Sequence, residues 1–317
     1  MNILVTGGAG FIGRWVVKEL LEKGETVAVL DDLSNGSADN LEEFKDSEGY
    51  KGLVEGSIVD NDLLLELFHK NNFELCIHCA AQINVQESLD NPEISYKVNM
   101  QGTYNILECA RKFDTKLVLI GTCMVYDIAD TLKPINENHP LLPASPYAGS
   151  KLAAENLAYS YYKGFDLPIV ILRPFNTYGP FQKANMEGGV VAIFVQKMLN
   201  GDTLNIFGDG KQTRDLLYVE DCANFIVKAA YSKDAVGEVI NAGTGNDISI
   251  NALAKLVVKD DSRIKHIEHH HPQSEIQKLV CDSSKAKRIL GWEPETSLEE
   301  GIKKLEIWQR GSSQWKN

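Results

Sequence analysis

Short apolar runs alternate with amphipathic segments along the first half of the chain. Continuous apolarity within a short run is typical of strands that are buried on both faces, as in a parallel sheet. Five runs rich in Val, Ile and Leu are therefore predicted strands: Asn2–Thr6, Thr26–Asp31, Leu75–Cys79, Lys116–Gly121 and Pro168–Arg173.

The segments between these runs have the period of an α-helix. In Phe11–Lys23, apolar residues recur on one helical face, at Ile12, Trp15, Val16 and Leu20. Similar patterns predict helices over Asn61–Lys70, Pro92–Phe113 and Ser145–Lys163. Strict alternation of strand and helix predicts an α/β fold with a doubly wound parallel sheet of the Rossmann type.

The rhythm changes after about residue 175, where irregular stretches and shorter helices follow. We expect a smaller α/β unit there, mostly C-terminal. No Pro/Gly/Ser-rich linker separates it from the first unit, so the two should pack closely together. The predicted division gives residues 1–175 to the large unit, with a strand returning near 237–245. Residues 176–236 and 246–317 then form the smaller unit. Ser297 and Glu300 have capping-box spacing and predict the start of a last helix.

Composition narrows the choice of partners. The chain has 317 residues and a net charge of −12, and no Lys/Arg run supplies the basic face that nucleic acid requires. No apolar run reaches the ~18 residues that would span a membrane, and we expect no signal peptide. The six cysteines lie mostly in apolar segments, which is typical of a reduced, cytoplasmic protein. We therefore expect a cytoplasmic protein with no nucleic-acid or membrane partner.

A glycine-rich loop joins the first predicted strand to the first predicted helix. Gly7, Gly10 and Gly13 let the backbone approach a pyrophosphate, whose charge meets free N–H groups at the helix N-terminus. The second strand ends in Asp31 and Asp32, 18 residues beyond Gly13. A carboxylate at this offset binds the adenosine ribose hydroxyls and repels a 2′-phosphate. The sequence therefore predicts NAD as the cofactor in preference to NADP.

Tyr147 and Lys151 are the candidate catalytic pair. They lie one helical turn apart, on one face of a predicted helix. An ammonium beside a phenol favours the phenolate, and an oxidised nicotinamide adds positive charge in the same sense. Tyr147 can then accept a hydroxyl proton while hydride leaves the same carbon for NAD⁺.

Together with these features, further motifs recur in the order of a known family. They include His78-Cys-Ala-Ala81, Asn99-Met-Gln-Gly-Thr103, Leu172-Arg-Pro-Phe-Asn-Thr-Tyr-Gly-Pro180, Phe207-Gly-Asp-Gly-Lys-Gln-Thr-Arg-Asp215 and Leu290-Gly-Trp-Glu-Pro294. The chain resembles the extended short-chain dehydrogenases/reductases nearly end to end. Within them it resembles the NAD-dependent nucleotide-sugar epimerase/dehydratase group, and its UDP-glucose 4-epimerase-like members.

The resemblance implies a role for each matching position. Tyr147, Lys151 and Thr122 would be catalytic. The residues that would bind NAD are Gly7, Gly10, Phe11, Ile12, Gly13, Asp31, Asp32, Ser34, Asn35, Gly36, Ser57, Ile58, Ala80, Ala81, Gln82, Asn99, Tyr147, Lys151, Pro174 and Phe175. Those that would bind a nucleotide-diphosphate sugar are Thr122, Cys123, Asn176, Asn205, Phe207, Arg214 and Glu275. The large unit would then bind NAD and the smaller unit the nucleotide sugar.

The reaction stays open among three hypotheses. A 4-epimerase would oxidise C4 of a UDP-glucose-like sugar and return the hydride to the opposite face. A dehydratase would use the same 4-keto sugar for elimination, and a non-catalytic NAD-binding regulator would use neither step. In the 4,6-dehydratases that this stretch resembles, two acidic residues follow the threonine, whereas here Cys123 and Met124 follow Thr122. A thioether cannot carry a proton, which excludes Met124 as the base. Cys123 could serve as a weak acid or base if neighbours lowered its pKa, but a small buried apolar residue is the preferred interpretation, so the sequence favours the epimerase.

Two further patterns are interpreted as packing or assembly. Cys76 and Cys79 match C-x-x-C, but residues three apart on a strand point to opposite faces, so packing is the preferred interpretation. We expect no metal site there or at His269–His271. The family resemblance also implies a homodimer through the helices near 92–113 and 145–163.

Overall fold

A computed structural model describes residues 1–127, 133–184, 189–268 and 277–311. Its main sheet has seven parallel strands in the order β10-β6-β5-β4-β1-β2-β3. The strands are β1 (Asn2–Thr6), β2 (Thr26–Asp31), β3 (Tyr50–Glu55), β4 (Leu75–His78), β5 (Lys116–Ile120), β6 (Ile169–Pro174) and β10 (Val239–Ala242). All five predicted strands lie in this sheet. The strand order reverses between β1 and β4, which is where doubly wound folds bind their ligands.

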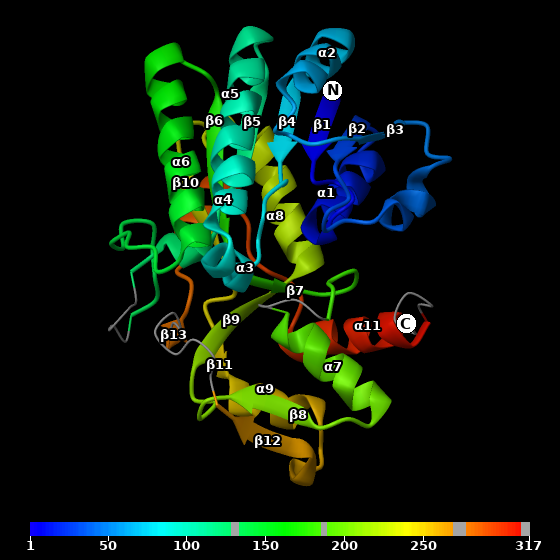
Figure 1. Cartoon of the computed structure of the whole chain (residues 1–317), viewed down its shortest axis with the longest axis vertical. Helices are drawn as coiled ribbons and strands as arrows, with labels where there is room; N and C mark the ends of the chain where they lie inside the picture. The colour runs from blue at the N-terminus through cyan, green and yellow to red at the C-terminus, as the bar shows by residue number, and fades with distance from the viewer. Residues whose placement is uncertain (128–132, 185–188, 269–276, 312–317) are drawn as a thin grey trace.

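Helices cover both faces of this sheet (Figure 1). One apolar cluster joins the sheet to α1 (Phe11–Glu22) and α8 (Val219–Tyr231). A second cluster joins the other face to α2 (Asn61–Asn71), α5 (Thr103–Lys112) and α6 (Pro146–Phe165). In β1, Ile3 and Val5 belong to the first cluster and Leu4 to the second. Burial on both faces explains the continuous apolar runs, and the α/β fold prediction is confirmed.

The long helix predicted over residues 92–113 is divided in the structure. It consists of α4 (Pro92–Ser95), a π-helical turn over Tyr96–Gly102 and α5, preceded by the short helix α3 (Val85–Asp90). Such π-turns occur often at functional sites, where the extra residue re-aims a side chain.

The edge strand β3 was not predicted from the sequence. Its side chains are only partly buried or exposed, and it contains Lys51 and Gly52. A strand with one free edge needs fewer apolar residues, so it lacks the pattern that identified its neighbours.

A smaller unit lies below the main sheet in Figure 1. Four short strands form one sheet: β7 (Asn176–Tyr178), β9 (Thr213–Tyr218), β11 (Asp247–Ser249) and β13 (Lys278–Leu279). A second sheet pairs β8 (Leu204–Phe207) with β12 (Ile264–Ile267). The flanking helices include α7 (Val190–Asn200), α9 (Ile250–Val257) and α11 (Leu298–Gly311). Ser297 Oγ accepts a hydrogen bond from the Glu300 amide at 3.3 Å, so the predicted cap of α11 is present.

Two helices pack differently from the predicted division of the chain. Helix α10 (Ser284–Leu290) falls within residues 246–317, which we assigned to the smaller unit, but it packs against β10, and its Ala286 belongs to the apolar cluster of the main sheet. Helix α8 falls within residues 176–236, which we assigned to the smaller unit, but it packs against α1. Its Phe225 and Ile226 belong to the apolar cluster of the main sheet. The packing therefore groups α8 and α10 with the large unit, and the domain boundaries stay a prediction. Within the described ranges, no helix has both the length and the apolarity to cross a membrane.

Candidate active site

A cavity of about 450 Å³ opens at the carboxyl ends of β1, β2 and β4. Many of the predicted NAD-binding residues line it: Gly7, Gly10, Phe11, Ile12, Gly13, Asp31, Asp32, Ser34, Asn35, Gly36, Ile58, Ala80, Ala81 and Gln82. The lining also contains residues that the sequence did not predict to bind the cofactor: Leu30, Gly56, Cys79, Ile83, Asn84, Glu87, Ile94 and Val98. Sequence segments as distant as residues 7 and 98 thus meet in one cavity.

The glycine loop fits closely between β1 and β4. Gly7 has a φ of +70°, and a Cβ there would lie 2.6 Å from the Ala80 nitrogen. A Cβ on Gly13 would collide with the Gly7 carbonyl oxygen. No side chain caps the first turn of α1. The positive end of this helix can therefore receive a phosphate.

Asp31 and Asp32 differ in their surroundings. Asp31 is buried, and its carboxylate accepts hydrogen bonds from the amides of Ala9 and Leu33, both at 2.9 Å. Burial raises the pKa of Asp31, although these amides oppose the rise. Asp32 is exposed and accepts hydrogen bonds from the amide and hydroxyl of Ser34. Asp31 therefore anchors the glycine loop and also lines the cavity, whereas Asp32 lies at its rim.

Tyr147, Lys151 and Thr122 lie together, buried, where β5 ends beside α6. A hydrogen bond joins Tyr147 to Thr122 and opposes the effect of burial, which raises the pKa of Tyr147 to about 12. Lys151 Nζ donates to the Ile120 carbonyl at 2.7 Å. Burial lowers the pKa of Lys151 to about 8. None of the three is among the residues that line the cavity, but Lys151 lies close enough to Cys79, which does line it, to interact with that thiol electrostatically.

Asn99 lies behind the cavity and positions Gln82. Asn99 Oδ1 accepts a hydrogen bond from the Gln82 backbone nitrogen at 2.8 Å, and Asn99 Nδ2 donates to the Gln82 backbone carbonyl at 3.0 Å. It also donates to Ser150 Oγ on α6 at 2.9 Å. The π-helical turn contains Asn99, so the irregular backbone directs this amide between the cavity wall and α6.

Other predicted cofactor residues also lie outside the lining. Ser57 Oγ accepts from the Val59 amide at 3.3 Å, so this hydroxyl is used within its own turn. Pro174 ends β6, and the buried Phe175 packs in a cluster with Cys123. These three residues are neighbours of the site, and their roles toward a cofactor stay predictions.

The predicted substrate-binding residues are spread over several strands of the smaller unit. Asn176 begins β7 and pairs with Leu216 of β9, the strand that carries Arg214. Arg214 interacts electrostatically with the Cys123 thiol, so it lies near the end of β5. Asn205 and Phe207 are exposed on one face of β8. Glu275 and the His269–His271 segment lie outside the described residues.

A buried carboxylate that the sequence did not single out holds this region together. Asp215 accepts from the amide and hydroxyl of Thr244 at 2.8 and 2.7 Å, and from the amides of Gly245 at 2.9 Å and Cys281 at 3.0 Å. These bonds tie β9 to two other chain segments, next to Arg214. The sequence identified the motif that ends at Asp215, but it did not indicate which distant residues bind this carboxylate.

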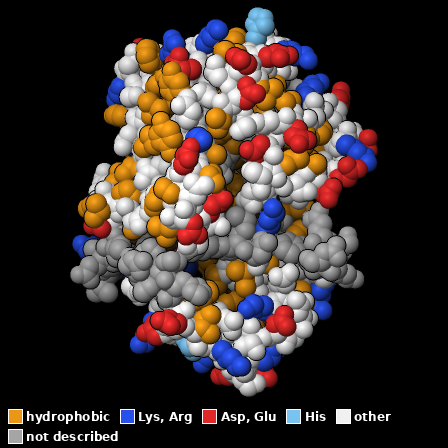
Figure 2. Space-filling model, in the orientation of Figure 1, with side chains coloured by type: hydrophobic (Ala, Val, Ile, Leu, Met, Phe, Trp, Pro, Cys, Tyr) orange, Lys and Arg blue, Asp and Glu red, His pale blue; other side chains and the backbone are white. Residues whose placement is uncertain are grey.

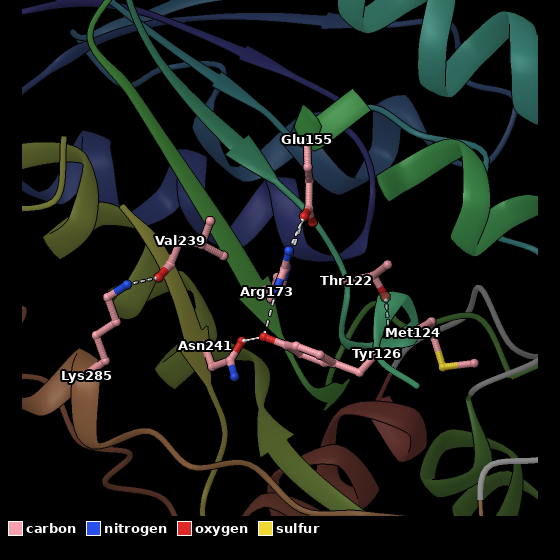
Figure 3. A network of polar contacts seen from close by, with 8 residues as sticks. All are labelled: Thr122, Met124, Tyr126, Glu155, Arg173, Val239, Asn241 and Lys285. Atoms are coloured by element: carbon pink, nitrogen blue, oxygen red, sulfur yellow. Dashed lines mark hydrogen bonds and ion pairs between the residues drawn. The ribbon is translucent and has the colours of Figure 1, made fainter. Parts of the chain in front are cut away.

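A second buried network lies beside Thr122 and was also not predicted. Figure 3 shows Glu155 of α6 bound to Arg173 of β6, and Arg173 bound to the Tyr126 hydroxyl. The Tyr126 hydroxyl in turn donates to Asn241 Oδ1 at 2.7 Å. Glu155 follows Lys151 by one helical turn, which is the only signal that the sequence offered.

The cysteines of the C-x-x-C pattern pack on opposite faces of the sheet. Cys76 belongs to one apolar cluster, and Cys79 packs against the other. All six cysteines are free thiols. In the part of the chain that the structure describes, no group of three or more His, Cys, Asp or Glu side chains is arranged to hold a metal.

Comparison with known proteins identifies the class. The family model described as GDP-mannose 4,6 dehydratase matches residues 4–305. A putative UDP-glucose 4-epimerase of Methanocaldococcus jannaschii is 38% identical over 314 residues, which are 98% of this chain and 99% of that protein. The chain belongs to this family of nucleotide-sugar epimerases and dehydratases, within the extended short-chain dehydrogenases/reductases.

Two solved structures are closely similar. Pal from Bacillus thuringiensis has a TM-score of 0.96 and 55% identity, covering 98% of this chain and 99% of that one. The UDP-glucose 4-epimerase of Thermus thermophilus in complex with NAD has a TM-score of 0.90 and 31% identity, covering 98% and 100%. The family resemblance expected from the sequence is therefore confirmed. The particular reaction and substrate belong to the proposal below.

Proposed function

We propose that this protein is an NAD-dependent enzyme that epimerises C4 of a nucleotide-diphosphate sugar through a transient 4-keto sugar. The observation that carries the proposal is the buried trio of Tyr147, Thr122 and Lys151, whose Lys151 interacts with Cys79 in the wall of the cavity behind the glycine loop. A non-catalytic regulator would have no need for a phenol and an ammonium buried side by side.

The cavity fits NAD in shape and charge. Gly7 and Gly13 leave no room for a Cβ where a pyrophosphate would approach the start of α1. Asp31, at the end of β2, would bind the adenosine ribose and disfavour a 2′-phosphate. When bound, NAD⁺ supplies a hydride acceptor that can later return the hydride.

Tyr147 is the proposed base. It would take the proton of the sugar O4 hydroxyl as the C4–H bond breaks, and Thr122 would hold the same hydroxyl. Burial raises the pKa of Tyr147 to about 12. The Lys151 ammonium and the positive nicotinamide would both lower this pKa. Tyr147 would return the proton to O4 once the keto sugar has turned its other face.

Arg214 is the proposed contact for the diphosphate. It lies on β9 near Cys123, at the edge between the two units. A guanidinium binds two phosphate oxygens at once and stays charged at every relevant pH. Asn176, Asn205 and Phe207 would contact the sugar and the nucleotide from β7 and β8.

Epimerisation is favoured over dehydration by the two residues after Thr122. Burial raises the pKa of Cys123 to about 12, so this thiol is neutral near pH 7 and a poor acid or base for elimination. The Met124 thioether cannot transfer a proton. The name of the relative from Methanocaldococcus jannaschii supports the same choice, whereas the description of the family model favours the dehydratase.

Product analysis tests the proposal. The purified protein is incubated with a panel of UDP-, dTDP-, GDP- and CDP-sugars, and products are identified by NMR and mass. We expect a C4 epimer of unchanged mass, and a Cys123→Ala variant that keeps most of the activity. A product lighter by one water, together with an inactive Cys123→Ala variant, would replace the epimerase with a dehydratase.

We further propose a homodimer through α5 and α6. Figure 2 shows hydrophobic side chains gathered on the upper left of the molecule, over these helices. Tyr104, Tyr159 and Phe165 are exposed there, at 42%, 47% and 57%. Such a patch is suited to a second copy of the chain. Light scattering should give twice the chain mass for the wild type and the single mass for Tyr159→Glu with Phe165→Glu, whereas a wild-type monomer would reject the proposal.

A further inference from the structure

A buried ion pair lies directly behind the proposed catalytic trio. Arg173 donates to Glu155 Oε2 from Nε at 3.0 Å and from Nη2 at 2.6 Å, and its Nη1 donates to the Tyr126 hydroxyl at 2.9 Å. Glu155 is 3% exposed and Arg173 4%. Burying two charges costs free energy that a hydrophobic pair would not, so such a pair is weak evidence for a purely stabilising role.

Only one oxygen of Glu155 is used by this ion pair. Arg173 Nε and Nη2 both bind Oε2, and none of the hydrogen bonds of the described residues ends on Oε1. The Thr122 backbone amide lies close to the carboxylate and, with Arg173, opposes the rise in the pKa of Glu155 that burial causes. Oε1 lies against Gly121, where any Cβ would collide with it. Gly121 immediately precedes Thr122. Oε1 thus lies at the end of β5, where Lys151 also reaches the Ile120 carbonyl.

His78 and Cys79 also interact electrostatically with Lys151, and both are neutral at pH 7. From β4 and the residue after it, His78 has its pKa lowered by burial to about 3, and Cys79 has its pKa raised by burial to about 12. On α6, burial raises the pKa of Tyr147 to about 12. Glu155 is the carboxylate that opposes the desolvation of the Lys151 ammonium.

We propose that Glu155 is a positioning residue that keeps Lys151 protonated at neutral pH, with Arg173 fixing the carboxylate that does so. The inference rests on the proposed function, because it matters for turnover only if Lys151 assists Tyr147. Glu155 itself touches neither substrate nor cofactor in this scheme. Its effect reaches the reaction through the charge on Lys151.

The sign of the effect distinguishes this role from a structural one. A negative charge raises the pKa of every group near it, and Glu155 raises the pKa of both Lys151 and Tyr147. Replacing it with a neutral amide should therefore move both limbs of the pH–rate profile to lower pH. A merely structural residue would lower the rate at every pH and leave the limbs in place.

The test compares Glu155→Gln with wild type in two measurements. The first is the pH profile of kcat/KM on the best nucleotide sugar. We expect the apparent pKa of each limb to be lower by about 1 pH unit in Glu155→Gln. The rate at pH 8.5 divided by the rate at pH 6.5 should then drop about tenfold. Tyr126→Phe is the matched control, because it breaks a hydrogen bond of Arg173 and leaves both charges in place. Tyr126→Phe should leave the apparent pKa of each limb unchanged. Glu155→Asp, which keeps the negative charge, should have limbs close to those of wild type.

The second measurement needs no turnover. In protein labelled with ¹³C at the lysine ε-carbon, the resonance missing from Lys151→Met reports the protonation of Lys151. Its pKa should be lower in Glu155→Gln than in wild type by about 1. If Glu155→Gln does not fold, the Glu155→Gln, Arg173→Gln double variant removes both charges and should still lower this pKa. An unchanged Lys151 pKa in the folded variant rejects the inference. A wild type inactive on every nucleotide sugar rejects the proposed function alone, since the NMR titration still tests Glu155.

Discussion

Asp31 gives the sharpest test of the cofactor site, because the same carboxylate serves the fold and the ligand. Each of its two carboxylate oxygens accepts one hydrogen bond at 2.9 Å, Oδ2 from the Ala9 amide and Oδ1 from the Leu33 amide. In Asp31→Ala both amides lose an ionised acceptor, and hydrogen bonds of this kind contribute about 1.5–3 kcal/mol each. Relief of the buried charge offsets part of the loss, since burial already raises the pKa of Asp31. We expect unfolding free energy to fall by about 1–3 kcal/mol.

The loss of NAD⁺ affinity should be of similar size. One charge-assisted contact to the ribose hydroxyls accounts for about 1–3 kcal/mol, or roughly ten- to a hundredfold in Kd. Isothermal titration at fixed ionic strength measures NAD⁺ and NADP⁺ on wild type, Asp31→Ala and Asp31→Asn. The Asn variant keeps the size and removes the charge, so it isolates the repulsion of a 2′-phosphate. A wild type that prefers NADP⁺, or an Asp31→Ala variant within twofold of wild type for NAD⁺, would refute the reasoning.

Three further changes test the rest of the site. Tyr147→Phe should leave folding and NAD⁺ binding nearly intact while turnover falls by about 10²–10⁴-fold, and undiminished steady-state turnover would remove Tyr147 as the base. Arg214→Ala should raise KM far more than it lowers kcat, because a diphosphate is remote from C4; the opposite split in initial-rate kinetics would give Arg214 another role. His78 is neutral in the fold, with its pKa lowered to about 3, but protonates in the unfolded chain below its ordinary pKa of about 6.5. The free energy of unfolding should therefore fall by about 2 kcal/mol between pH 7 and 5 because of His78. Urea titrations should show that His78→Asn loses about 2 kcal/mol less than wild type over this range.

The sequence by itself determined the large sheet, the glycine loop and the Tyr147–Lys151 pair. These features are local: strands buried on both faces are apolar throughout, a phosphate loop needs glycines at fixed spacing, and one helical turn separates the two catalytic candidates. The edge strand β3 carried no such pattern, and neither did the grouping of α8 with α1.

Only the tertiary structure decided which distant side chains share a charge environment. Glu155, Arg173 and Asn241 come from α6, β6 and β10, and they meet because those strands are neighbours in the sheet. Asp215 likewise gathers amides from segments 29 to 66 residues away. Such contacts depend on strand order and helix packing, which no local period encodes. The pKa of Lys151 follows from burial and from the Glu155 carboxylate, so the charge state of the proposed site is a property of the packed fold.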